Sequence, residues 1–140
     1  MNSEADRETR IAALLAKDGR YPRAAYDFVC QAVSIIAREI ARGQPESSDK
    51  HISIPQLLLG LKKLLLAKYG CMAIDILNAW NITSTDDFGN IVFSLAGIRL
   101  LKTSAEDSLQ DFHHQFSFYD AFIRPFQPDG PARPMPIINI

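Results

Sequence analysis

The sequence predicts an all-α fold of five or six helices. Apolar residues recur every three or four positions through several long segments, which is the period of a helix with one buried face. Ser or Thr precedes several of these segments and Gly or Asn follows them, as helix boundaries favour. Alternation of apolar and polar residues never extends beyond about four positions, so no long strand is expected.

The first two predicted helices span residues 3–17 and 22–42. Gly19 follows the first, Pro22 takes the first helical position of the second, and Gly43 ends it. The apolar faces contain Ile11, Leu14 and Leu15 in the first helix, and Ala25, Phe28, Val29, Ala32, Ile36 and Ile40 in the second.

The third predicted helix, 54–68, is apolar on two faces. Ser53 and Gln56 form a capping-box pattern at its start, and Gly70 terminates it. One face contains Leu57, Leu58, Leu61, Leu64 and Leu65, and the opposite face contains Leu59 and Leu66. Such a helix lies between neighbouring helices or meets a second subunit, so a homodimer is one alternative.

Three further helices are predicted at 71–80, 85–97 and 103–116. Ser84 caps the middle one, with two aspartates in the first turn, where the helix dipole favours negative charge. Residues 44–52, rich in polar side chains, are predicted to form an exposed loop.

The C-terminal part divides into an aromatic segment and a Pro-rich tail. The aromatic segment 116–126 is expected to pack back across the second and third helices, which completes one helical domain over residues 1–127. Residues 128–140 are expected to form an extended tail, either a strap over the domain or a peptide for a partner, by strand addition.

Composition excludes several classes of function. The net charge is −1 and the pI is about 6.3, so no basic excess indicates nucleic acid or an anionic membrane. The sequence has no apolar run long enough to span a bilayer and no signal-peptide pattern. Two cysteines are too few for a disulfide framework, and the expected location is the cytoplasm.

Two acidic pairs, Asp86–Asp87 and Glu106–Asp107, could supply acid–base chemistry. Each follows a Ser or Thr at a predicted helix start, so helix capping explains both pairs without catalysis.

Metal and thiol chemistry are also disfavoured. Asp107, Asp111 and His114 would share one face of a helix and could ligate a divalent ion, although a solvated polar face is commoner. Cys30 and Cys71 have no neighbouring base that would make a nucleophile. The sequence lacks phosphate-loop, nucleophile-elbow and dinucleotide motifs, so neither a cofactor nor a catalytic residue is predicted.

The order of three predicted helices suggests nucleic-acid binding as an alternative function. Residues 54–68, 72–80 and 85–97, followed by 98–104, have the order of a winged helix-turn-helix unit. A recognition helix must present donors and cations to DNA, whereas the segment 85-TDDFGNIVFSLAG-97 has two aspartates and no Lys or Arg. Nucleic-acid binding is therefore the weaker alternative.

The motifs 20-RYPRAAYDFV-29, 86-DDFGNIVF-93, 107-DSLQDF-112 and 121-AFIRPF-126 carry a family resemblance. They are similar to R-Y-x-x-x-A-Y-x-F-V, E-D-F-G-E-I-V-F, D-S-x-x-D-F and A-F-x-K-P-F in a family of short, uncharacterised bacterial proteins. The resemblance covers roughly residues 11–127 and implies a fold unit without implying a reaction. Asn90 replaces a usual glutamate, and neither His113–His114 nor the C-terminal tail belongs to the pattern.

The start of the second helix holds the candidate interaction residues. Arg23 is predicted to pair with Asp27 one turn later, and Tyr21, held extended before Pro22, is predicted to pack as a staple. Arg20 is predicted to pair with an acid that is distant in sequence. The candidate partners are Asp87, Asp107 and Asp111, which lie in segments that match the family.

Such a pair would clamp the helix start onto the C-terminal half of the domain, with Tyr26 against the same junction. The alternative is a site for an anion or an acidic partner, built from Arg20, Arg23 and the free N–H groups of the helix.

Because catalytic, metal, thiol and nucleic-acid sites are all disfavoured, the functional hypothesis is reached by exclusion. The lead function is a non-enzymatic protein-interaction or adaptor module in the bacterial cytoplasm, with a protein as partner. The alternatives are a winged-helix-like nucleic-acid-binding protein and an enzyme whose site the sequence does not reveal.

Overall fold

The computed structural model describes residues 3–43, 52–103 and 107–127, and in these ranges the chain is helical with no strand. The helices are α1 (Ser3–Lys17), α2 (Arg23–Gly43), α3 (Ile54–Tyr69), α4 (Ala73–Ala79) and α5 (Thr85–Gly97). Shorter turns are η1 (Gly70–Met72), η2 (Leu109–Phe112), η3 (Tyr119–Ile123) and η4 (Arg124–Phe126). The all-α prediction is confirmed. No helix in the described ranges has the length and hydrophobicity needed to cross a membrane.

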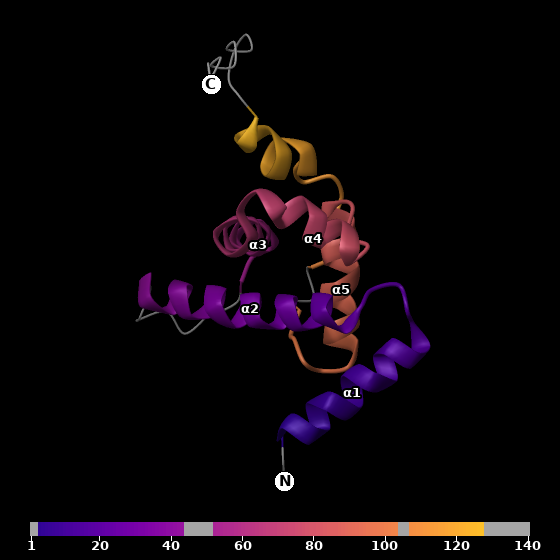
Figure 1. Cartoon of the computed structure of the whole chain (residues 1–140). Helices are drawn as coiled ribbons and strands as arrows, with labels where there is room; N and C mark the ends of the chain where they lie inside the picture. The colour runs from indigo at the N-terminus through magenta and orange to yellow at the C-terminus, as the bar shows by residue number, and fades with distance from the viewer. Residues whose placement is uncertain (1–2, 44–51, 104–106, 128–140) are drawn as a thin grey trace, which may run out of the picture.

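The core forms where α2 packs against α3 and α5 (Figure 1). A Cβ atom on Gly60 of α3 would lie 2.4 Å from Cδ1 of Ile36 of α2, so this glycine lets the two helices approach closely. The predicted stripe of α3 faces this core through Leu57, Leu58, Leu61 and Leu65. On the opposite face, Leu66 is partly buried against the core, while Leu59 is exposed.

Local capping sets the starts of α3 and α5. Ser53 and Gln56 exchange hydrogen bonds in a capping box, and Ser84 and Asp87 do the same. Gly70 ends α3 with φ of 56°, a conformation that glycine adopts at little cost. The helix α2 begins at Arg23, so Pro22 lies just before the helix and not in its first position, where the sequence predicted it.

The predicted helix 103–116 is wrong. Of its described residues, Leu109–Phe112 form a single 3-10 turn, a further turn follows at 113–114, and His114 has φ of 44°. A capping box between Ser108 and Asp111 starts this turn. The ring of Phe112 is buried against Gly89 of α5, and this tertiary contact directs the backbone away from a continued helix.

The aromatic segment contacts α3 as predicted, but it packs beside α4 and α5 and not across α2. Phe118 contacts Phe88 of α5 at 5.8 Å between ring centroids, η3 contacts α4, and the Lys62 ammonium of α3 lies over the Phe116 ring. Figure 1 shows η3 and η4 beyond α3 and α4, on the side away from α2. The expected packing across α2 is therefore wrong.

Three predictions fall mainly or entirely outside the described residues. They concern the loop 44–52, of which only residue 52 is described, the tail 128–140 and the role of Glu106.

Candidate functional site

A hydrogen bond joins the start of α2 to the start of α5. The buried Tyr21 donates its hydroxyl to Oδ1 of Asp87, with 2.5 Å between the oxygens. The Tyr21 hydroxyl also accepts a hydrogen bond from Nδ2 of Asn90 at 3.1 Å. Burial raises the pKa of the Tyr21 phenol, and the bond to Asp87 raises it further.

Asp87 is the centre of this junction. Its Oδ2 accepts hydrogen bonds from the N–H of Thr83 at 2.8 Å, the Thr83 hydroxyl at 3.2 Å and the N–H of Ser84 at 3.3 Å. With Tyr21 on the other oxygen, both oxygens of the carboxylate accept hydrogen bonds within the fold. This arrangement suits a structural joint.

Arg20 does not make the predicted pair. Within the described part of the chain, its guanidinium forms no salt bridge, and it lies over the Tyr21 ring, with Cζ 5.9 Å from the centroid. The backbone of Arg20 is held instead, because its carbonyl accepts from Nδ2 of Asn81 at 3.0 Å and its N–H donates to Asp18 at 3.1 Å. The start of α2 is joined to Asp87 as expected, but the side chain that makes the contact is Tyr21 and not Arg20.

Arg23 connects α1 to α2. It forms the predicted pair with Asp27 at 3.4 Å and a second salt bridge with Glu8 of α1. The hydrogen bond from Arg23 lowers the pKa of the Glu8 carboxyl. An anion at this helix start would have to compete with two carboxylates for Arg23.

Tyr26 lies against the same junction, as expected. Its ring centroid is 6.3 Å from that of Tyr21 in an edge-to-face arrangement, and the side chain is fully buried. Its hydroxyl has no hydrogen-bond partner within the described ranges. Burial raises the pKa of this phenol as well.

The remaining predicted acids lie elsewhere. Oδ2 of Asp111 accepts from the N–H of Ser108 at 2.9 Å, which completes the cap of η2. Asp107 lines a cavity between α2, α3 and α5. Because residues 107–114 do not form one helix, the predicted metal-binding face of Asp107, Asp111 and His114 is not formed.

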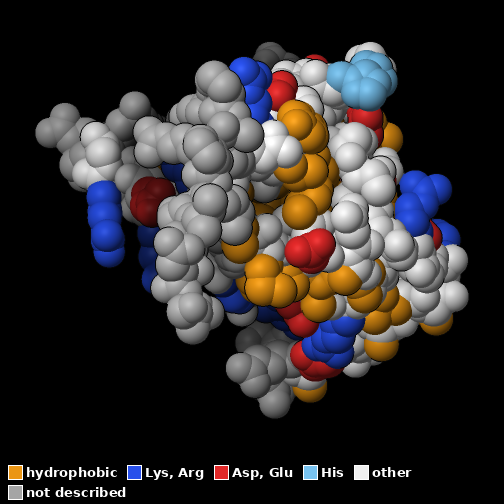
Figure 2. Space-filling view, turned by 45° about the horizontal axis from the view of Figure 1, so that its top comes forward, with side chains coloured by type: hydrophobic (Ala, Val, Ile, Leu, Met, Phe, Trp, Pro, Cys, Tyr) orange, Lys and Arg blue, Asp and Glu red, His pale blue; other side chains and the backbone are white. Residues whose placement is uncertain are grey.

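The structure instead gathers Asp86, His113 and His114. Nδ1 of His113 lies 3.0 Å from Oδ1 of Asp86, and the two imidazole centroids are 3.9 Å apart. Figure 2 shows the histidines, in pale blue, at the surface beside an acidic side chain. Sequence reasoning missed this cluster because 27 residues separate Asp86 from His113. The adjacent histidines were the only signal.

The cavity beside Asp107 has a volume of about 440 Å³. Its walls are mainly apolar, with Lys102, Thr103 and Asp107 as polar contributors. The apolar lining includes Val33, Ile54, Leu57, Val92 and Phe112.

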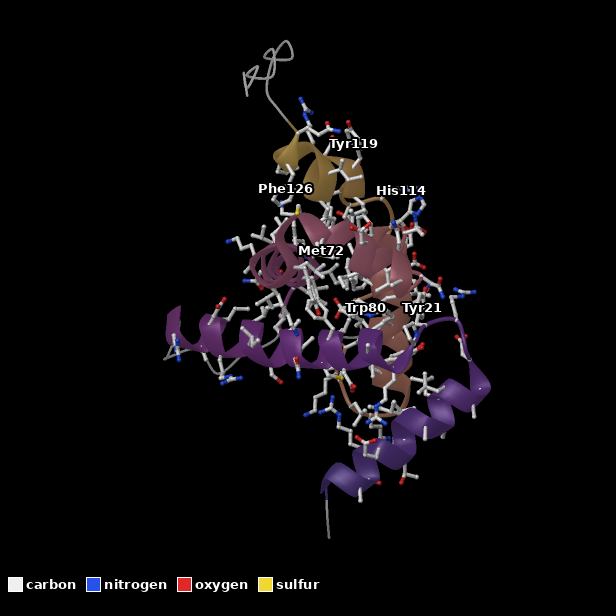
Figure 3. All side chains as sticks on the ribbon, viewed as in Figure 1. Tyr21, Met72, Trp80, His114, Tyr119 and Phe126 are labelled. Carbon is white, nitrogen blue, oxygen red and sulfur yellow. The ribbon has the colours of Figure 1, made fainter. Side chains whose placement is uncertain are left out.

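Large apolar side chains are exposed at and near the C-terminal turns, and Figure 3 shows Tyr119 and Phe126 at the end of the domain away from α1. Met72, Tyr119 and Phe126 are each about half exposed, and we call these three residues the apolar end (Figure 3). They come from η1 and from the C-terminal turns.

Comparisons with known proteins gave no match: no family model, no curated protein and no solved structure is similar to this chain. The family resemblance of the motifs therefore stays a prediction.

Proposed function

We propose that this chain is a protein-interaction module that binds its partner through the apolar end, Met72, Tyr119 and Phe126. The observation that carries the proposal is the exposure of these side chains, at 56%, 50% and 49%. Exposed Met, Tyr and Phe are the residue types that protein interfaces favour, and exposed apolar surface marks interaction sites. Following the motif resemblance, we place the module in a bacterial cytoplasm.

An aromatic cluster packs around η3, the turn that carries Tyr119. Phe118 packs on Phe122 at 5.3 Å and on Phe116 at 5.9 Å between ring centroids, and on Phe88 of α5. The hydroxyl of Tyr119 donates to Gln127 at 2.9 Å. A preorganised surface loses less conformational entropy on binding, which favours a specific contact.

The charge of α3 indicates the chemistry of the partner. This helix contains Lys62, Lys63 and Lys68 and no acidic residue. Lys62 reaches over the Phe116 ring, so at least one of these charges lies beside the aromatic segment. An acidic amphipathic segment of another protein would complement both the apolar side chains and the lysines.

The experiment compares charge substitutions at matched exposure. Met72→Glu and Phe126→Glu should abolish partner capture from the native cell, while Leu109→Glu, at a residue of 50% exposure outside the apolar end, should not. Cross-linking with mass spectrometry should place captured partners near Lys62, and their linked peptides should be acidic. Identical capture by all three variants would refute the proposal.

The cavity supports a second candidate function, the binding of a small apolar molecule with an anionic group. A mainly apolar cavity of this size with a few polar side chains is typical of ligand sites, and Lys102 could receive the anion. Dodecanoate is a suitable probe.

A filling substitution tests this candidate. Ala37 lines the cavity, so Ala37→Leu should remove dodecanoate binding in a calorimetric titration. Ala24→Leu is the matched control, because Ala24 is an exposed position of the same helix. Equal binding by the two variants would exclude the cavity as the site.

A further inference from the structure

We infer that Asp86, His113 and His114 form a binding site for a divalent transition-metal ion of the zinc type. One ligand atom from each residue lies within 4.8 Å of the other two. Two ligands of a tetrahedral zinc ion stand roughly 3.3 Å apart. The 3.0 Å between Asp86 and His113 is already close to this separation, so small side-chain rotations complete the site.

Buried contacts hold the three residues in place. Thr85, which precedes Asp86, is fully buried, and its hydroxyl donates to the carbonyl of Phe112 at 2.6 Å. The same hydroxyl accepts from the N–H of Gln115 at 3.0 Å. These two bonds fasten the backbone on both sides of His113 and His114 to the first turn of α5. The histidine pair is thus preorganised beside Asp86.

The ligand set selects the class of metal. Imidazole nitrogen suits zinc, nickel and copper, whereas magnesium and calcium prefer oxygen ligands. The helix dipole gives the start of α5 a partial positive charge, which disfavours a cation, and the negative charge of the Asp86 carboxylate offsets this effect. The side chains of Asp86 and His113 are 35% and 50% exposed, so water can fill the remaining coordination positions.

The test is a calorimetric titration of the full chain with zinc chloride. The protein should carry no polyhistidine tag, and Cys71→Ser should be present throughout, because the exposed thiol of Cys71 could bind zinc. We expect one zinc ion per chain. His113→Ala and His114→Ala should each weaken binding by at least about tenfold, and Asp86→Asn should also weaken it. His51→Ala is the control and should leave the affinity unchanged.

Thermal melting provides an independent measurement. Zinc should raise the melting temperature of the parent chain, chelation should reverse the rise, and the histidine variants should show none. All variants should melt normally without zinc, because His113 and His114 are exposed. If a histidine variant fails to fold, Asp86→Asn decides the question. The absence of zinc binding in the parent, or tight binding that persists in the His113→Ala/His114→Ala double variant or in Asp86→Asn, would overturn the assignment.

Discussion

Gly89 of α5 lies directly under the ring of Phe112. A Cβ atom at Gly89 would come within 2.7 Å of Cγ and 2.9 Å of Cβ of Phe112. These atoms are at the base of the side chain, so rotation of the ring cannot relieve the overlap. The contact joins α5 to η2 and brings the histidine pair to the start of α5.

Gly89→Ala is expected to destabilise the fold. Overpacking costs about 1–3 kcal/mol, toward the upper end here because the backbone of η2 must move, and the helix preference for Ala offsets up to about 1 kcal/mol. Urea unfolding should show a net loss. Gly97→Ala is the control, since a Cβ atom there meets nothing within 4 Å. Equal stability of the two variants would contradict the contact.

The two buried tyrosines should respond in opposite ways to loss of the hydroxyl. Tyr21→Phe removes hydrogen bonds to Asp87 and Asn90 and should cost about 1–3 kcal/mol. Tyr26→Phe removes a buried hydroxyl that has no partner among the described residues, so it should leave stability unchanged or raise it. Denaturant unfolding of both variants measures the difference. An equal loss at both positions would contradict these assignments.

Stability should fall in alkaline solution. Burial raises the pKa of the Tyr21 phenol, so the folded state favours the protonated form. This contribution is fully present below the unfolded value of about 10 and is lost as the pH rises through the folded value. Between about pH 9 and 11, Tyr21→Phe should lose less unfolding free energy than the parent chain. A parallel decline would assign the loss to other groups.

The two thiols should react at different rates. Burial raises the pKa of the Cys30 thiol, and Cys71 is exposed. A thiol-reactive disulfide reagent should modify Cys71 quickly and Cys30 only after unfolding. Cys71→Ser should remove the fast phase, and Cys30→Ser should retain it. A fast phase that survives Cys71→Ser would show that Cys30 is accessible.

Local sequence determined most of the helices. The cap of α3 by Ser53 and Gln56, its end at Gly70 and the cap of α5 by Ser84 depend on residues within one turn of each other. Helical periodicity likewise identified the buried faces of α2 and α3, because each follows from the geometry of a single helix.

Only tertiary structure decided the segment from Asp107 to Phe116 and the contacts of the candidate sites. The sequence pattern of this segment favours a helix, but the packing of Phe112 on Gly89 and the two hydrogen bonds of Thr85 hold it in another conformation. The choice of Tyr21 over Arg20 as the partner of Asp87 also depends on how two helix starts meet. Residues far apart in the sequence form these contacts, and their geometry is set by the packing of the whole domain, which no local pattern encodes.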